Sequence, residues 1–401
     1  MLKNKNRVKR NLLTINGVIE FKRTLLVPAD KESAENLKKI QESKSVCPLD
    51  CMLGIDNLPF KITIHMMSAI AKEGVRASSY RRATEAIKEH YHIDISERTV
   101  RDVTDYVGVV LFEYCKHEAD KAKDNHGTPI DRRKKHRKDD DILYLEMDGS
   151  MVETRPLSAK DDKWRECKIG IAFLSEDIKT WITKKGEERR VITKKRFTGF
   201  IGYYKDFQYY LLSIAEYYQY KYRSKIVIIS DGAEWISKIR KELFPEAIHI
   251  LDLSHVKEHV NRYAKWLFKT DETAIKQWVA EINTMIENSQ TQEVLSKLAE
   301  YKDLKHPTDI TNLYKYIYER QESMDYKAFK DAGFYVGSGA IESANKYIMQ
   351  DRMKLQGMRW NVSNAQGMLT LKTYYESDCW NEVEPLLEQH FKSKNLSVES
   401  N

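Results

Sequence analysis

The sequence predicts an α/β protein in which buried strands carry the chemistry and helices precede, interrupt and follow them. Two buried apolar runs, Ile226–Ile229 and Ile248–Leu253, are typical of strands covered on both faces. The first run is followed by Asp231, and the second carries Asp252 shortly before His255. Because chemistry gathers at the carboxyl ends of strands in open α/β sheets, these acids indicate a metal-binding active site.

Length and composition limit the number of domains, the kinds of partner and the cellular setting of the protein. The chain has 401 residues, enough for two or three domains, and 67 basic against 60 acidic residues give a net charge of +7. This small excess of positive charge is compatible with a polyanionic partner, but it does not by itself predict one. Five scattered cysteines without a CxxC pair, no secretory signal and no long apolar run together predict a soluble, reduced, cytoplasmic protein.

Residues 1–50 are expected to form a β-hairpin and a helix. The stretch 7–28 alternates around Asn16-Gly17, which predicts a hairpin with a type I′ turn, and residues 30–46 have a charged, helical pattern.

Residues 51–125 form a predicted helical region of the helix-turn-helix type. Helices are expected at 60–72 and 79–90, and a third begins after Ser96, a good N-cap. Arg98, Thr99 and Arg101 would then occupy an exposed first turn, where recognition helices meet base edges in the major groove. The alternative is an ordinary helical bundle with a solvated basic face.

Residues 126–141 are a charged stretch with Gly and Pro, interpreted as a solvated linker. Its basic half, Arg132–Lys138, offers a second interpretation as a track for a phosphate backbone.

Residues 142–255 have the element order of an RNase H-like core. Strands are expected at 142–148, 166–174 and 190–197, followed by a helix at 206–222 and the two buried runs. In that architecture the first and fourth strands are neighbours, which brings Asp148 beside Asp231. A single Asp-Gly is ordinarily a turn, but two that each close a buried strand favour an active site.

The rest of the chain is predicted to be helical. Residues 256–332 are a helical insertion, and residues 333–401 supply the final helices of the core and a C-terminal tail. A helix at 341–353 carries Glu342 in its first turn. An acidic residue in the first turn of a helix is ordinarily explained by its favourable interaction with the helix dipole. Glu342 becomes a functional candidate only as a third carboxylate beside Asp148 and Asp231.

Three carboxylates suit phosphodiester chemistry. Two Mg²⁺ or Mn²⁺ ions hold a nucleophilic water and neutralise the leaving oxygen of an in-line displacement. Both ions prefer oxygen ligands, so Asp148, Asp231 and Glu342 are the candidate metal ligands and catalytic residues. Glu146, two residues before Asp148 on the same strand face, is either a secondary ligand or simply a buried or paired acid.

Several long motifs resemble bacterial insertion-sequence transposases of the Kra type, a group similar to Mutator-like elements. They cover most of the chain and include DGSMVETRP, ISDGAEWI, FPEAIHILDLSHVKEHV and VGSGAIESANKYIMQDRMKLQGMRW. The resemblance implies a DDE transposase that binds element-end DNA, cleaves phosphodiester bonds and joins strands. It also implies terminal inverted repeats and target duplex as partners, a homodimer or larger synaptic assembly, and a prokaryotic, nucleoid-associated location.

Carried over residue by residue, the resemblance assigns the catalytic acids to Asp148, Asp231 and Glu342. Its Asp-x-x-His motif falls on Asp252 and His255 as a supporting pair, and His255 either orients a phosphate or caps Asp252. Asn345 stands where relatives carry a cysteine.

Arg352, Arg359 and Trp360 fit DNA contacts near the cut, although Trp360 also suits core packing. Two other functions stay open. One is an RNase H-like, structure-specific nuclease without strand transfer, and the other is a domesticated DNA-binding protein derived from a transposase.

Overall fold

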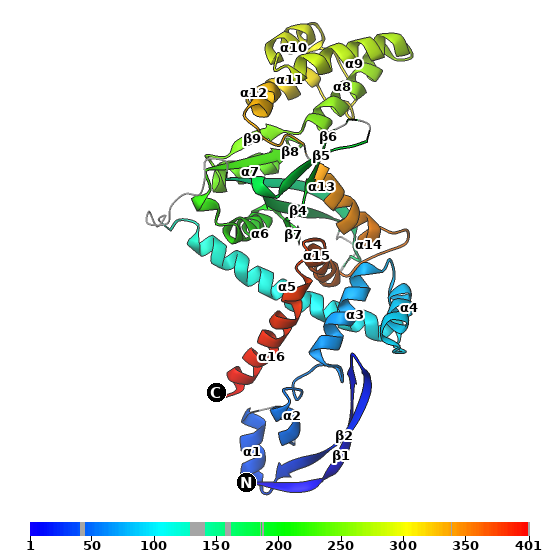
Figure 1. Cartoon of the computed structure of the whole chain (residues 1–401), viewed down its shortest axis with the longest axis vertical. Helices are drawn as coiled ribbons and strands as arrows, with labels where there is room; N and C mark the ends of the chain where they lie inside the picture. Colours follow the sequence, from blue (N-terminus) through cyan, green and yellow to red (C-terminus); the bar gives the residue numbers. More distant parts are fainter. Residues whose placement is uncertain are drawn as a thin grey trace. The chain divides into compact units, whose positions relative to one another are not determined.

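A computed structural model describes residues 1–40, 45–128, 141–156, 162–184, 186, 188–337 and 339–399 (Figure 1). Most of the predicted linker, including Arg132–Lys138, lies outside these residues. The chain divides into two compact units. Unit 1 comprises 1–117, 152–164 and 348–401, and unit 2 comprises 118–151 and 165–347.

Unit 1 begins with the predicted hairpin. Strand β1 (Leu2–Thr14) pairs antiparallel with β2 (Gly17–Pro28), and Thr14 lies opposite Gly17. The turn residues are therefore Ile15 and Asn16. Neither has a positive φ, whereas Gly17 has φ +102°, so the predicted type I′ turn is wrong. Two helices follow, α1 (Lys31–Ile40) and α2 (Pro48–Met52).

Three predicted helices of unit 1 are confirmed, with the first beginning four residues later than expected. They are α3 (Ile64–Arg76), α4 (Tyr80–Tyr91) and α5 (Glu97–Asn125). Ser96 caps α5 as predicted, since its Oγ accepts the backbone N–H of Thr99 at 3.1 Å. The boundary between the units falls within α5.

The last helices also belong to unit 1, which differs from the predicted division at 333–401. They are α14 (Asp351–Met353), α15 (Val362–Glu376) and α16 (Val383–Glu399). Most of α15 is buried, because it crosses α5 at two glycines: a Cβ added to Gly108 would lie 2.8 Å from the backbone of Gly367. Only the absence of side chains allows that approach.

The core of unit 2 is a five-stranded sheet. Its strands are β3 (Ile142–Glu153), β4 (Trp164–Leu174), β7 (Arg196–Ile201), β8 (Lys225–Ser230) and β9 (Ile248–Leu251). The order is β7-β4-β3-β8-β9; β8 runs parallel to β3 and β9, and β7 antiparallel to β4. The expected neighbourhood of the first and fourth core strands is confirmed.

The predicted strand 190–197 is wrong as a single element. Strand β6 (Glu188–Ile192) pairs with β5 (Ile178–Ile182) as a separate hairpin, and β7 starts only at Arg196. The chain bends between them, where Thr193 donates its backbone N–H to the carbonyl of Asp177 at 2.9 Å.

Two helices pack on this sheet, α6 (Tyr204–Tyr217) and α7 (Glu234–Leu243) (Figure 1). They bury apolar side chains against β3 and β8, among them Leu143, Leu145, Phe207, Leu211, Ile228 and Ile236. Burial of this apolar area fixes the strands whose ends carry the predicted acids.

The insertion after β9 is helical, as predicted. It comprises α8 (Leu253–Phe268), α9 (Glu272–Glu287), α10 (Thr291–Leu298), α11 (Leu313–Tyr318) and α12 (Tyr326–Asp331). Helix α13 (Gly339–Ala344) follows and continues into a π-helical turn, Asn345–Gln350. Short 3₁₀ turns occupy Ser175–Asp177, Tyr220–Tyr222, Ala299–Tyr301, Gln321–Ser323 and Trp380–Glu382. None of the helices in the described part of the chain is both long and apolar enough to span a bilayer.

Candidate active site

Asp148 lies within β3, which continues to Glu153, so the prediction that Asp148 closes its strand is wrong. Asp231 does directly follow the last residue of the parallel neighbour β8. The β3–β8 register pairs Glu146 with Ile229, so each aspartate lies two residues further along its own strand direction. Asp148 accepts the backbone N–H of Gly149 at 2.7 Å and the side-chain amide of Asn345 at 2.5 Å. Burial raises the pKa of the Asp148 carboxyl, and the nearby negative charge of Asp231 raises it further.

Asp252 and His255 form a tight pair at the start of α8. Asp252 is fully buried, caps the helix by accepting the backbone N–H of His255 at 2.9 Å, and contacts the ring Nδ1 of His255 at 2.7 Å. That hydrogen bond raises the pKa of His255 to about 9, although partial burial opposes the shift. The imidazole is therefore positively charged at neutral pH, with Asp231 and Asp148 within its electrostatic reach.

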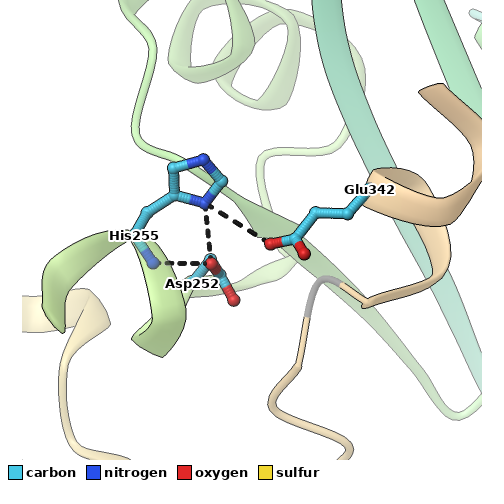
Figure 2. A group of neighbouring side chains, drawn as sticks. All are labelled: Asp252, His255 and Glu342. Carbon is cyan, nitrogen blue, oxygen red and sulfur yellow. Dashed lines mark hydrogen bonds and ion pairs between the residues drawn. The ribbon is translucent and has the colours of Figure 1, made fainter. Parts of the chain in front are cut away.

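Glu342 approaches this pair from α13. Its Oε1 lies 3.9 Å from Nδ1 of His255, and Figure 2 shows the three side chains pointing toward one another. The ligand atoms of Asp252, His255 and Glu342 all lie within 4.8 Å of each other, which is the spacing of a potential cation site.

The predicted trio is therefore only partly brought together. Among the described residues, the group within 4.8 Å contains Glu342 but neither Asp148 nor Asp231. Asp148 instead accepts a hydrogen bond from Asn345, one turn after Glu342, whereas Glu342 itself extends toward the cationic ring of His255.

Glu146 is a buried acid that pins the helix carrying Glu342. It is 0% exposed, and its Oε2 accepts the backbone N–H of Ile341 at 3.0 Å. Burial raises the pKa of its carboxyl to about 8. Its second oxygen, Oε1, and the Oδ1 of Asn345 are buried without a hydrogen-bond partner among the described residues. Both orphan oxygens are the atom type that hard cations prefer.

Two residues of the insertion hold the backbone beside Asp231, and sequence reasoning missed both. Tyr316 donates its hydroxyl to the carbonyl of Asp231 at 3.1 Å, and Arg320 donates to the carbonyl of Gly232 at 3.1 Å. Gly232 has φ +84°, and an added Cβ would lie 2.7 Å from Arg320 Nε. No local pattern signals these contacts, because the partners are more than 80 residues apart in the chain.

The predicted DNA-reading residues of α5 are accessible. The side chains of Arg98 and Arg101 are 83% and 50% exposed, and both pair with Asp102, at 3.5 and 2.9 Å. Thr99 lies between them in the first turn and is half-buried. Such exposed ion pairs contribute little to stability.

Arg352 and Trp360 are buried, at 2% and 8% exposure, which does not suit the predicted DNA contacts and agrees with the alternative of core packing for Trp360. The Arg352 guanidinium lies between the rings of Tyr80 and Trp360, at 4.7 and 5.4 Å, and donates to a backbone carbonyl of α3. Arg359 is exposed and forms an ion pair with Glu153 at 3.0 Å.

The His255–Asp252 pair leads to a titration prediction. The His255 ring is expected to lose its proton near pH 9, and Asp252→Asn, which keeps a capping side chain, should return that pKa toward its ordinary 6.5. Because the folded pKa is raised, the pair stabilises the fold fully below pH 6.5, and this contribution is lost as the pH rises through 9. NMR of ¹³C-histidine-labelled protein in EDTA measures both values; a wild-type midpoint near 6.5 would contradict the assignment.

Comparison with known proteins gives the family. The family model described as "Uncharacterised protein family (UPF0236)" matches residues 2–390. A relative from Streptococcus gallolyticus, "UPF0236 protein in vanSb 3'region", is 26% identical over 245 residues, which are 58% of this chain and 49% of the relative. The chain thus spans about half the length of that relative. With almost its whole length matched, the chain belongs to the UPF0236 family.

Proposed function

We propose that the protein is a DDE transposase that binds element-end DNA, cleaves phosphodiester bonds and joins strands. One observation carries the proposal: the parallel register of β3 and β8, which puts Asp148 of β3 and Asp231, the residue after β8, at corresponding positions of neighbouring strands. Two carboxylates that lie close together and partly buried repel each other, and this repulsion is relieved when a cation binds between them or one carboxylate takes up a proton.

The sheet order supports an RNase H-like core. Leaving aside the β5–β6 hairpin, the order along the sheet is third, second, first, fourth, fifth, with the last two strands parallel to the first. An RNase H-like domain has its first and fourth strands as neighbours in the same way. A helical insertion after the fifth strand also agrees with the transposase resemblance.

The donor set fits a pair of Mg²⁺ or Mn²⁺ ions. Asp148, Asp231 and Glu342 would supply carboxylate oxygens once Glu342 turns from His255 toward the two aspartates. The Glu146 and Asn345 side chains, which bind Ile341 and Asp148, each add an oxygen without a partner among the described residues. When bound, such ions activate an attacking oxygen and neutralise the leaving one.

The remaining roles belong to side chains of the chain itself. Glu146 fixes the helix start from which Glu342 extends, and Tyr316 with Arg320 fixes the backbone at Asp231. In the proposal, Asp252 keeps His255 protonated, so that the ring attracts a phosphate oxygen of the bound strand. The assembly would contain at least two copies, one for each end, and would act on DNA in the bacterial cytoplasm.

A cleavage and joining assay tests the proposal. Duplexes made from the sequences flanking the gene, incubated with the full chain, should be cut with Mg²⁺ or Mn²⁺ and left intact in EDTA. Joined strands would separate a transposase from a nuclease that only cuts. No metal-dependent cutting of any duplex, with DNA binding retained, would instead favour a domesticated DNA-binding protein and overturn the proposal.

A further inference from the structure

The N-terminal hairpin carries most of the net charge of the chain. Residues 1–28 contain seven cationic side chains and one carboxylate, which leaves +6 of the formal +7 of the whole chain. A two-stranded ribbon has little interior of its own in which to bury apolar area. This concentration of positive charge on a small element suggests that the hairpin binds an anionic partner.

One face of the hairpin uses its cations internally. Arg10 and Arg23 both bind Asp50 of α2, whose side chain is only 3% exposed, and Arg10 also donates to the carbonyl of Ile55 at 2.9 Å. Leu12, on the same face of β1, is 4% exposed. This face therefore packs the hairpin against the segment that contains α2, within unit 1.

The opposite face presents its cations to solvent. Arg7 and Lys9 lie two residues apart on β1, and Lys22 on β2 is directly opposite Lys9; all three are exposed. Like charges directly opposite each other destabilise a strand pair. Lys9 is partly relieved by Glu20 at 2.6 Å, whereas neither Arg7 nor Lys22 takes part in an ion pair within the described part of the chain.

We propose that this outer face, Arg7, Lys9 and Lys22, binds the phosphate backbone of duplex DNA, with the hairpin lying in or along the major groove. The inference rests on the proposed function and deepens it, because it adds a DNA contact apart from the α5 helix and the acids. The width of the major groove admits a two-stranded β-ribbon, and the phosphates complement the charge.

Two more exposed lysines lie toward the open end of the ribbon, beyond a bulge at which the alternation of the outer face is interrupted. Lys3 and Lys5 precede Arg7, and the strand register shifts between Asn4 and Asn6, which bends and twists β1 at this point. A twisted ribbon follows a groove better than a flat one does.

A membrane surface is the less suitable anionic partner. Interfacial binding needs an apolar face to enter the lipid. Over the paired stretch 7–11 the outer face is polar, and its members are Arg7, Lys9, Asn11, Glu20, Lys22 and Thr24. Such a face matches phosphates held at fixed spacing along a groove.

The test compares two triple variants of the full chain that remove the same charge. One is Arg7→Gln/Lys9→Gln/Lys22→Gln. The control neutralises three exposed lysines elsewhere, Lys276, Lys315 and Lys392, whose side chains are 79%, 73% and 76% exposed. Fluorescence anisotropy with a 30-base-pair duplex is measured across a salt series.

The hairpin variant should bind more weakly, and the slope of log affinity against log salt should fall by roughly 2.7, which is about 0.9 for each lost contact. The control should keep the wild-type slope. Equal slopes for both variants, or a wild-type slope in the hairpin variant, overturn the inference. Binding of the wild type to phosphatidylserine vesicles that is lost in the hairpin variant, with DNA binding unchanged, also overturns it.

Cleavage by the same proteins separates this inference from the proposed function. If the hairpin variant binds DNA like wild type while metal-dependent cutting proceeds, the inference fails and the transposase proposal stands. If the hairpin variant loses DNA affinity but no protein cuts DNA with Mg²⁺ or Mn²⁺, the DNA-binding ribbon stands and the catalytic proposal fails.

Discussion

Asp231→Asn is expected to lower metal-dependent DNA cleavage by about 10³-fold or more while leaving DNA binding largely intact. The change removes one anionic ligand from the carboxyl end of β8 and keeps its size, so the turn at Gly232 is preserved. Electrostatic stabilisation by a bound divalent ion amounts to several kcal/mol, and each 1.36 kcal/mol is about tenfold in rate. Cleavage kinetics and anisotropy on the same end-containing duplex give both quantities.

Asp303→Asn is the matched control, since it removes the same charge from an exposed position of the insertion. It should cut like wild type. Full cutting by Asp231→Asn would remove Asp231 from the active site, and equal loss of binding and cutting would assign it to the fold.

Gly108→Val is expected to have the largest effect on stability. A Cβ at position 108 already meets the carbonyl carbon and oxygen of Gly367 at 2.8 Å, and these are backbone atoms that cannot rotate away. Overpacking of this kind costs about 1–3 kcal/mol, occasionally more. For a unit of this size, we expect the thermal midpoint measured by circular dichroism to fall by roughly 5–10 °C.

Gly127→Val supplies the control, because an added Cβ there meets nothing within 4 Å. Its midpoint should stay within about 2 °C of wild type, as is usual for surface substitutions. An unchanged midpoint in Gly108→Val would show that α15 does not cross α5 at these glycines.

Parts of this fold were predictable because their signals are local. The apolar runs that end in Asp231 and precede His255 marked buried strands, and Ser96 marked a helix start. The hairpin itself is predicted correctly, but its turn type is wrong because Asn-Gly favours type I′, whereas among Ile15, Asn16 and Gly17 only Gly17 adopts a positive φ.

Other features depend on residues far apart in sequence. Arg352 is of a residue type that is typical of DNA contacts. Its guanidinium is nevertheless buried, because Tyr80, 272 positions earlier, and Trp360 cover it. The position of Glu342 depends on a hydrogen bond from Ile341, the residue before it, to Glu146. A charged side chain in a sequence does not reveal which aromatic rings will cover it.

Diffraction from crystals of the full chain with end DNA and Mn²⁺, with anomalous scattering to locate the metal, would show which acids bind it. We expect Mn²⁺ at Asp148 and Asp231, with the Glu342 carboxylate turned from His255 to join it, at roughly 2.0–2.5 Å from the oxygens. Mn²⁺ bound only by Asp252, His255 and Glu342, with Asp148 and Asp231 free of metal, would contradict this expectation.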